Sequence, residues 1–317
     1  MKKYFVILFN IISIATFAQS NDYTFQVGSI YNEYISASAS TKDGNLIFGG
    51  GFSKKASWKE NPIFSSAHEE DVFIIKTDKN GKPIWHKTFG GGSTEDVENI
   101  VVDKDNNIFV SISFEDNFYI DTFFIRSATY HNTLLVKLNP EGIVLWTKTF
   151  ESDYDNYPAN LAVDELGDVF ICGIVNGQYI KVESDSFFVK PNSNGNSTFL
   201  FKFNSNGQFG FGKILYSLND GSVTCKPLAV KDGEIYFSGR ISSYGDIYFN
   251  ENKINSGFSG IYILKLDFKG NIIRSDFYHT ESFGTTTEYI HINNDNSIYF
   301  ALTYADTLIF QNTNLGT

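Results

Sequence analysis

Short apolar segments alternate with polar turn clusters along most of this chain. Examples are "VFIIK" at 72–76 and "TLLVK" at 133–137, which are rich in Val, Ile, Phe and Leu and end in a lysine. Segments of this length and composition, separated by Asp, Asn and Gly, are typical of β-strands joined by tight turns. No stretch of ten or more residues follows a helical period, so the pattern predicts an essentially all-β chain.

One motif of this pattern recurs at a nearly constant distance. A strand that closes on a lysine is followed by a turn glycine and then by a further strand, as in "TDKNGKPIWHKTF" at 77–89 and "LNPEGIVLWTKTF" at 138–150. The turn glycines, separated by 61, 65 and 63 residues, are Gly81, Gly142, Gly207 and Gly270. The lysines that close the preceding strands are Lys76, Lys137, Lys202 and Lys265.

A second motif, which includes "NIFVSI" from Asn107 and "DVFICG" from Asp168, interleaves with the first. Each unit of about 62 residues therefore contains four antiparallel strands, with a variable loop between the second and the third. This is the blade of a β-propeller, and we expect about five blades. The expected units are 30–92, 93–153, 154–218, 219–282 and a partial unit at 283–317.

The repeated units must pack against each other to form a buried core. A single four-stranded sheet cannot bury a core, so similar sheets must stack and cover each other. We expect Trp85, Trp146 and Phe211, each four residues after a turn glycine, to pack between blades. Arg274 departs from this pattern in the fourth unit.

The segment "DVFIIKTDKNGKPIWHKTFGGGSTEDVENIVVDKDNNIFVSI" at 71–112 resembles the bacterial SBBP-type β-propeller repeat family. The resemblance spans nearly all of the chain after its first residues and is strongest at 71–173. It implies a propeller fold on a large secreted or surface protein, often one exported with a C-terminal sorting domain. It implies no catalytic residues.

The N-terminus has the pattern of a secretory signal peptide. Lys2 and Lys3 precede an apolar run from Tyr4 to Ala18, which is too short to span a membrane comfortably. We therefore expect residues 1–18 to be removed and the protein to be secreted or displayed on a bacterial cell surface, with no transmembrane segment after removal of the signal. No cysteine lies near the cleavage site, which argues against a lipid anchor.

Net charge bears on the binding partner, and cysteine content bears on disulfide formation. The net charge is −11, and without Lys2 and Lys3 it is about −13, with no basic block, which excludes nucleic acid as a partner. Cys172 and Cys225 are the two cysteines and lie in neighbouring units. Export would permit a disulfide between them, but two isolated buried thiols are the simpler interpretation.

The ends of the chain leave ring closure open. "YTFQVGS" at 23–29 resembles the end of a unit, whereas the fifth unit stops at Thr317, before a strand that ends in lysine. The N-terminal strand could complete the last blade of a five-bladed ring, or the ring could be incomplete because the chain is truncated. We favour truncation.

Motifs for catalysis, metals and cofactors are absent from the sequence. The histidines lack metal-ligand spacing, and no HExxH or GxSxG occurs. The spacing of Asp, Gly and Trp in the repeat also resembles the docking motif of quinoprotein dehydrogenases. Neither the calcium site nor the cofactor-stacking tryptophan of those enzymes is identifiable. Asp103 and Asp105 begin a pattern like a calcium loop, but Phe114 stands where its bidentate acid is required. A turn explains this segment better, so we expect no metal, cofactor or catalytic residue. His131, in a variable loop, is expected to be solvated.

Two sets of residues remain as binding candidates. Lys76, Lys137, Lys202 and Lys265 would lie on a circle in a propeller and could form a cationic ring, although lysines that reach into water are the simpler interpretation. The variable loops contain aromatic side chains that could bind a ligand, namely Trp58, Tyr119, Tyr130, Tyr179 and Tyr244. Each loop could instead form a small outer hairpin packed on its blade.

These observations favour a non-catalytic scaffold for recognition or adhesion, with an extracellular glycan or protein as partner. Two alternatives stay open. One is a secreted enzyme that acts on polysaccharide or peptide through carboxylates in a channel, and the other is a structural spacer within a larger surface protein.

Overall fold

The computed structural model describes residues 27–28, 33–53, 55–58, 61–65, 71–127, 131–189, 195–218, 221–243, 245–279, 286–293, 295 and 297–303. Every regular element in these ranges is a β-strand, which confirms the all-β prediction. Within them, no helix is long and apolar enough to cross a membrane. The expected signal peptide, residues 1–18, lies outside the described residues.

Successive sheets are built to one plan, in which each strand pairs antiparallel with the next strand of its unit. The first sheet contains β2 (Glu33–Ser40), β3 (Leu46–Phe52), β6 (Asp71–Thr77) and β7 (Pro83–Gly91). The second contains β8 (Glu95–Val102), β9 (Ile108–Phe114), β12 (Asn132–Leu138) and β13 (Val144–Ser152). The third contains β14 (Asn156–Val163), β15 (Val169–Val175), β18 (Ser197–Phe203) and β19 (Phe209–Ser217). The fourth contains β20 (Ser222–Lys231), β21 (Glu234–Ser242), β24 (Ser259–Leu266) and β25 (Ile272–His279).

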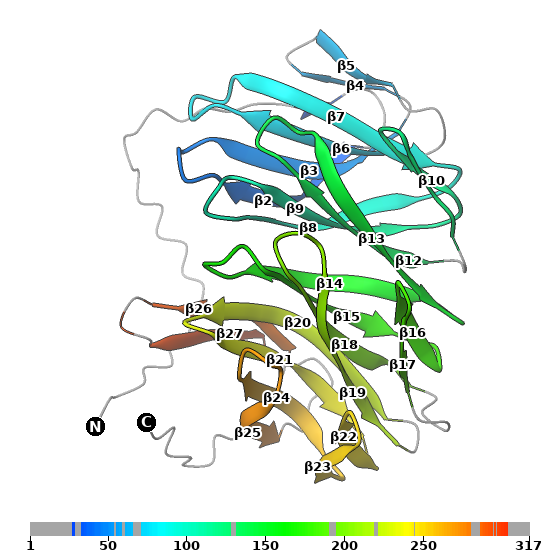
Figure 1. Cartoon of the computed structure of the whole chain (residues 1–317), viewed down its shortest axis with the longest axis vertical. Helices are drawn as coiled ribbons and strands as arrows, with labels where there is room; N and C mark the ends of the chain where they lie inside the picture. The colour runs from blue at the N-terminus through cyan, green and yellow to red at the C-terminus, as the bar shows by residue number, and fades with distance from the viewer. Residues whose placement is uncertain are drawn as a thin grey trace.

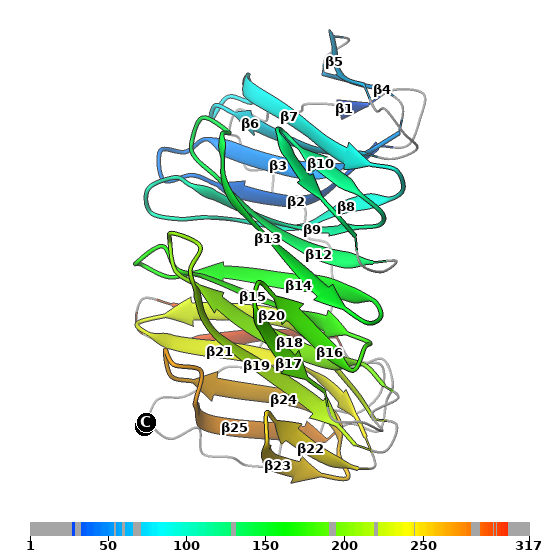
Figure 2. The ribbon, with the colours of Figure 1, turned by 45° about the vertical axis from the view of Figure 1, so that its right-hand side comes forward.

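The sheets lie face to face along the long axis of the molecule (Figures 1 and 2). The first strand of each sheet contacts the first strand of the next one, and this series continues to β26 (Thr286–Ile292), which pairs with β27 (Ile298–Thr303). Stacking of this kind gives each sheet the apolar cover that it lacks alone.

The variable loops form hairpins at the outer edges of the sheets, and each hairpin extends the sheet of the preceding unit. The outer hairpins are β10 (Phe118–Ile120) with β11 (Phe123–Ile125) on β7, β16 (Tyr179–Val182) with β17 (Asp185–Phe188) on β13, and β22 (Asp246–Phe249) with β23 (Asn252–Ser256) on β19. In the same way, β4 (Lys55–Trp58) with β5 (Asn61–Ser65) pairs with β1 (Val27–Gly28). The outer hairpins therefore connect neighbouring units by backbone hydrogen bonds.

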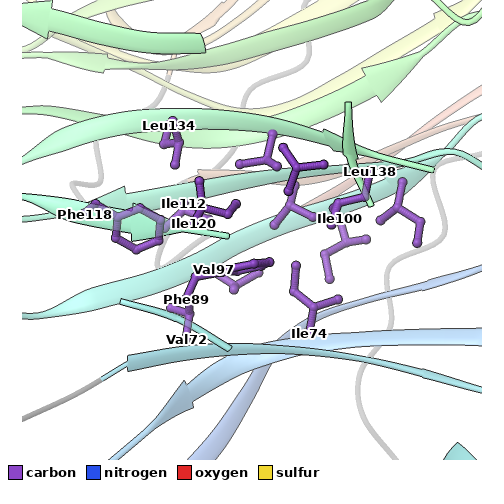
Figure 3. Packing of buried hydrophobic residues seen from close by; sticks show 14 of the residues in the cluster. Val72, Ile74, Phe89, Val97, Ile100, Ile112, Phe118, Ile120, Leu134 and Leu138 are labelled. Carbon is purple, nitrogen blue, oxygen red and sulfur yellow. The ribbon is translucent and has the colours of Figure 1, made fainter. Parts of the chain in front are cut away.

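Apolar side chains fill the spaces between the sheets. Between the first and second sheets, Val72 and Ile74 face Ile112 and Leu134, and Phe118 of the outer hairpin joins the same cluster (Figure 3). Separate clusters occupy the next two spaces, each with side chains from both of the sheets that it joins. Alternation along the strands explains this, because successive side chains point to opposite faces.

A polar contact accompanies the apolar packing where the first two sheets meet. Lys76 Nζ and Trp85 Nε1 both donate hydrogen bonds to the Pro140 carbonyl oxygen, at 2.8 and 3.0 Å, and Pro140 lies in the turn between β12 and β13 of the second sheet. The Trp85 ring also lies against Gly142 of that turn. We call this arrangement the lysine–aromatic clamp.

The clamp recurs between the second and third sheets. Lys137 Nζ donates to the Ser205 carbonyl oxygen at 2.8 Å, Trp146 Nε1 donates to the same oxygen at 3.4 Å, and the Trp146 ring lies against Gly207. Between the third and fourth sheets only the aromatic contact of the clamp is present. Phe211 packs on Gly270, whereas Lys202 pairs with Asp168 at 2.9 Å.

The lysines therefore differ from both sequence interpretations. Lys76 and Lys137 are buried, Lys202 and Lys265 form ion pairs with Asp168 and Glu234, and a β-bulge follows each of the four lysines. The first two ammonium groups point at a carbonyl of the next sheet, so they neither reach into water nor form a cationic ring open to an anionic polymer.

The clamp predicts that Gly142 tolerates no side chain. Its φ of 82° costs an alanine about 1–2 kcal/mol, and a Cβ there would lie 3.1 Å from the Trp85 ring, so Gly142→Ala should lower the free energy of unfolding by about 2–3 kcal/mol. Gly44→Ala is the matched control, because Gly44 has a φ of 83° and open space around it. Equal losses in urea unfolding of the two variants would contradict the clamp.

Candidate functional site

The outer hairpins expose pairs of aromatic side chains. On the first hairpin, the Tyr119 and Phe124 rings lie 5.0 Å apart across the strand pair and are 56% and 55% exposed. On the second, Tyr179 and Phe188 are directly paired with rings 6.4 Å apart; Phe188 is 73% exposed, whereas Tyr179 is half-buried. Aromatic side chains are enriched at protein interfaces, so exposed rings held in pairs are candidates for recognition.

Strand alternation sets the direction of these rings. Phe118 and Ile120, which flank Tyr119, are buried in the core between the first and second sheets. Ile180 and Val182 hold the same position under the second hairpin. Because neighbouring residues of a strand face opposite sides, Tyr119, between Phe118 and Ile120, and Tyr179, which precedes Ile180, face away from this core.

Ion pairs hold the β10–β11 and β16–β17 hairpins to the sheets that they extend. Lys87 of β7 pairs with Asp121 at 2.7 Å, and Lys148 of β13 pairs with Glu183. Asp121 and Glu183 both adopt positive φ in the hairpin turn, at 49° and 54°. Asn250 has the same conformation in the third hairpin, where its side chain accepts a hydrogen bond from the Ile214 N–H at 2.8 Å.

The remaining aromatic candidates are placed differently. Tyr130 and Tyr244 lie outside the described residues, and Trp58 lies in β4, in a part of the chain whose side chains are not described. On the third hairpin, Tyr248 stacks on Tyr216 with ring centres 5.4 Å apart. Phe124 and Phe188 were not among the aromatic residues predicted to bind, although "FYIDTFFI" and "DSFFV" contain them and a hairpin register would have paired them with the tyrosines.

A buried carboxyl group occupies the space between the first two sheets. Glu95 has no exposed surface, and burial, with the nearby carboxylates of Asp71 and Glu115, raises its pKa to about 9, against the lowering effect of the Ser93 and Gly91 backbone. One unit later the same position holds Asn156, whose amide accepts from the Thr133 N–H at 2.9 Å and donates to the Phe150 carbonyl. A protonated Glu95 is the neutral counterpart of that amide.

Two further acids lie on β8, among the first strands of the stack. Desolvation raises the pKa values of Asp96 and Glu98, and the charge of Asp96 adds to the effect on Glu98. Tyr34 donates a hydrogen bond to Asp96, and Ser113 Oγ donates to Glu98 at 2.9 Å. Among the described residues, these two carboxyl groups are the best candidates for the catalytic acids that the enzyme alternative requires.

The calcium-like segment is a turn. Asp103 Oδ1 accepts the backbone N–H groups of Asp105 and Asn107 at 2.9 and 2.8 Å, and its second oxygen lies 3.7 Å from Lys137 Nζ. Among the residues that the structure describes, no three His, Cys, Asp or Glu side chains are grouped to hold a metal ion. His131, expected in solvent, is half-buried, pairs with Glu115 at 3.0 Å and lies against Tyr157.

A shallow cleft of about 380 Å³ lies where the third outer hairpin approaches the fourth sheet. Phe249 and Asn252 line it from the hairpin, and Gly270 and Ser275 line it from the β24–β25 region. It contains a single ionisable side chain, Lys213, so its lining provides no acid–base pair.

No protein-family profile matches the chain. It is similar to an uncharacterized WD repeat-containing protein of Acanthamoeba polyphaga mimivirus, with 26% identity over 141 residues, which are 39% of this chain and 10% of that protein. The chain thus spans a tenth of the length of this relative.

Among solved structures, the chain is similar to a mutant of the Synechocystis apocarotenoid oxygenase, with a TM-score of 0.40, 12% identity, and coverage of 81% of this chain and 52% of that one. The cobalt-substituted form of the same oxygenase has a TM-score of 0.39, 12% identity and coverage of 81% and 51%. The chain spans about half the length of these structures. A likeness at this level carries no argument about activity.

The buried carboxyl predicts a specific pH dependence. Between pH 4.5 and about 9 the folded protein holds one more proton at Glu95 than the unfolded chain, so its contribution to stability, complete below 4.5, is lost by up to about 1.4 kcal/mol per pH unit as pH rises. Glu95→Gln should therefore unfold at an increasingly higher temperature than the wild type as pH rises from 5 to 9. Exposed Glu141→Gln is the control, and identical pH profiles for wild type and Glu95→Gln would contradict the assignment.

Proposed function

We propose that this chain is an exported β-propeller scaffold, of the SBBP-type repeat class, that recognises an extracellular glycan or protein through its outer hairpins. The four-stranded repeat of about 62 residues and the successive contacts among the first strands support the propeller. The partial similarity to a WD repeat-containing protein supports it too, since such repeats form four-stranded blades. The pattern of residues 1–18 supports export.

The observation that carries the recognition function is the placement of cross-strand aromatic pairs on two outer hairpins, with Tyr119, Phe124 and Phe188 exposed. Tyr119 with Phe124 and Tyr179 with Phe188 project from hairpins that belong to hydrogen-bonded sheets. Rings held in place lose little conformational entropy on binding, and they offer flat apolar faces to a sugar ring or to an apolar side chain. Their sequence varies among the units while the frame repeats, as expected of binding loops.

One alternative has a specific basis. Asp96 and Glu98 are acids with raised pKa values on the inner strand β8, and glycoside-cleaving enzymes use a pair of carboxyl groups. If the chain hydrolyses polysaccharide, Asp96→Asn and Glu98→Gln should each abolish that hydrolysis. A recognition scaffold shows no turnover with or without these substitutions.

Substitution of the exposed rings should weaken ligand binding without unfolding the protein. Binding of the purified chain to a glycan array and to an array of extracellular proteins identifies a ligand, whose Kd is then measured. Because an aromatic anchor at the centre of an interface contributes about 2 kcal/mol, the single variants Tyr119→Ser, Phe124→Ser and Phe188→Ser should each raise Kd about 30-fold.

Leu166→Ser and Phe268→Ser are matched controls, because these side chains are 73% and 56% exposed but lie in turns away from the outer hairpins. Loss of affinity in the controls equal to that in the hairpin variants, or no binding to either array, would contradict the recognition function.

Export has its own test. Expression of the full chain in a Gram-negative host should deliver to the extracytoplasmic fraction a product that lacks residues 1–18, and intact-mass measurement determines its first residue. A product retained in the cytoplasm with Lys2 and Lys3 still present would contradict export.

A further inference from the structure

Cys172 and Cys225, which are 53 positions apart in the chain, meet between the third and fourth sheets. Cys172 lies in β15 and Cys225 in β20, and both belong to one buried cluster. Both are free thiols in the structure, with 0% and 5% of their surface exposed. The Cys225 thiol donates to the carbonyl oxygen of Gly173, the residue that follows Cys172, at 3.5 Å.

The repeat gives an independent measure of how closely these two positions approach. Where the first two sheets meet, the equivalent residues are Gly49 and Val97, and a Cβ placed on Gly49 would lie 3.4 Å from the Cβ of Val97. Where the fourth sheet meets β26, they are Ser238 and Thr287, whose hydroxyl oxygens lie 3.3 Å apart. Disulfides have Cβ atoms about 3.5–4.5 Å apart, and the separation at Gly49 and Val97 lies close to that range.

From this geometry we infer that Cys172 and Cys225 form an intramolecular disulfide that joins the third sheet to the fourth. In the reaction, the Cys172 and Cys225 thiols lose two protons and two electrons and form one S–S bond. A protein or small-molecule disulfide accepts the electrons and protons and is reduced to two thiols. Because both sulfurs are buried in the folded chain, the bond forms during folding, before the two sheets close on each other.

The disulfide is independent of the proposed recognition function, since neither cysteine lies on an outer hairpin. It closes a loop that contains β16 to β19, so it restricts the unfolded chain and holds the two sheets together during thermal motion. Sheets that share an apolar face alone lack such a covalent link.

Alkylation and mass measurement test the bond directly. The full chain is unfolded in guanidinium and refolded with reduced and oxidised glutathione, then denatured with iodoacetamide and no reductant. The expected product is a monomer that gains no carbamidomethyl group, and after digestion the peptides with Cys172 and Cys225 are recovered as one linked species. Gain of two carbamidomethyl groups, or dimers linked between chains, would overturn the inference. The chain has no other cysteine, so the labels are unambiguous.

A thermal measurement provides the second test. Reduction of the refolded wild type should lower its Tm by roughly 5–10 °C, by the usual contribution of a disulfide to stability. The control is Cys172→Ser combined with Cys225→Thr, which reproduces the hydroxyl pair found at Ser238 and Thr287 and should not respond to reductant. A wild-type Tm that reductant leaves unchanged would also overturn the inference.

Discussion

The stack of sheets depends on contacts between a turn of one sheet and the side chains that the preceding sheet presents to it. Apolar burial draws sheets together, but it is non-directional and allows them to slide. The Pro140 carbonyl oxygen, which accepts hydrogen bonds from Lys76 and Trp85, and the Gly142 surface beneath the indole define one position. Because the lysine is buried, leaving its ammonium group without that carbonyl would cost far more than the hydrogen bond itself contributes. Register and burial are thus established together, and Lys137 and Trp146 repeat this with Ser205 in the next space.

The outer hairpins use the fixed register to present side chains. Each hairpin begins in one unit and pairs with the fourth strand of the preceding unit, so its position is determined by two sheets. Its inner face completes the core, as Phe118 and Ile120 do. Its outer face is not part of this core. Side chains on that face, such as Tyr119 and Phe188, can therefore be exposed and can differ from unit to unit. A repeated frame with variable outward faces supports the proposed recognition function.

Equivalent positions between the sheets carry different chemistry on the same geometry. The position held by Glu95 holds the Asn156 amide one unit later, and the position pair held by Cys172 and Cys225 holds Ser238 and Thr287 one unit further on. The repeat keeps two adjacent small side chains at the second pair of positions, whereas the first position holds an acid, an amide and, in β20, the buried Val223. Comparison across the repeat also identifies what is particular to one space between sheets: a titratable carboxyl in one and a pair of thiols in another.

The sequence by itself determined the strands, the turns and the repeat, because strand alternation and turn chemistry are local properties encoded within a few residues. It also indicated that Trp85, Trp146 and Phe211 belong to the frame, since their spacing from the turn glycines recurs. Only the tertiary structure decided which sheet each outer hairpin extends, that Lys76 and Lys137 turn inward, and that Glu95 approaches Asp71. These contacts join residues of different sheets. They depend on β-bulges within each sheet and on how one sheet packs against the next. A period of two along a strand distinguishes its two faces, but it does not specify what will cover each of them.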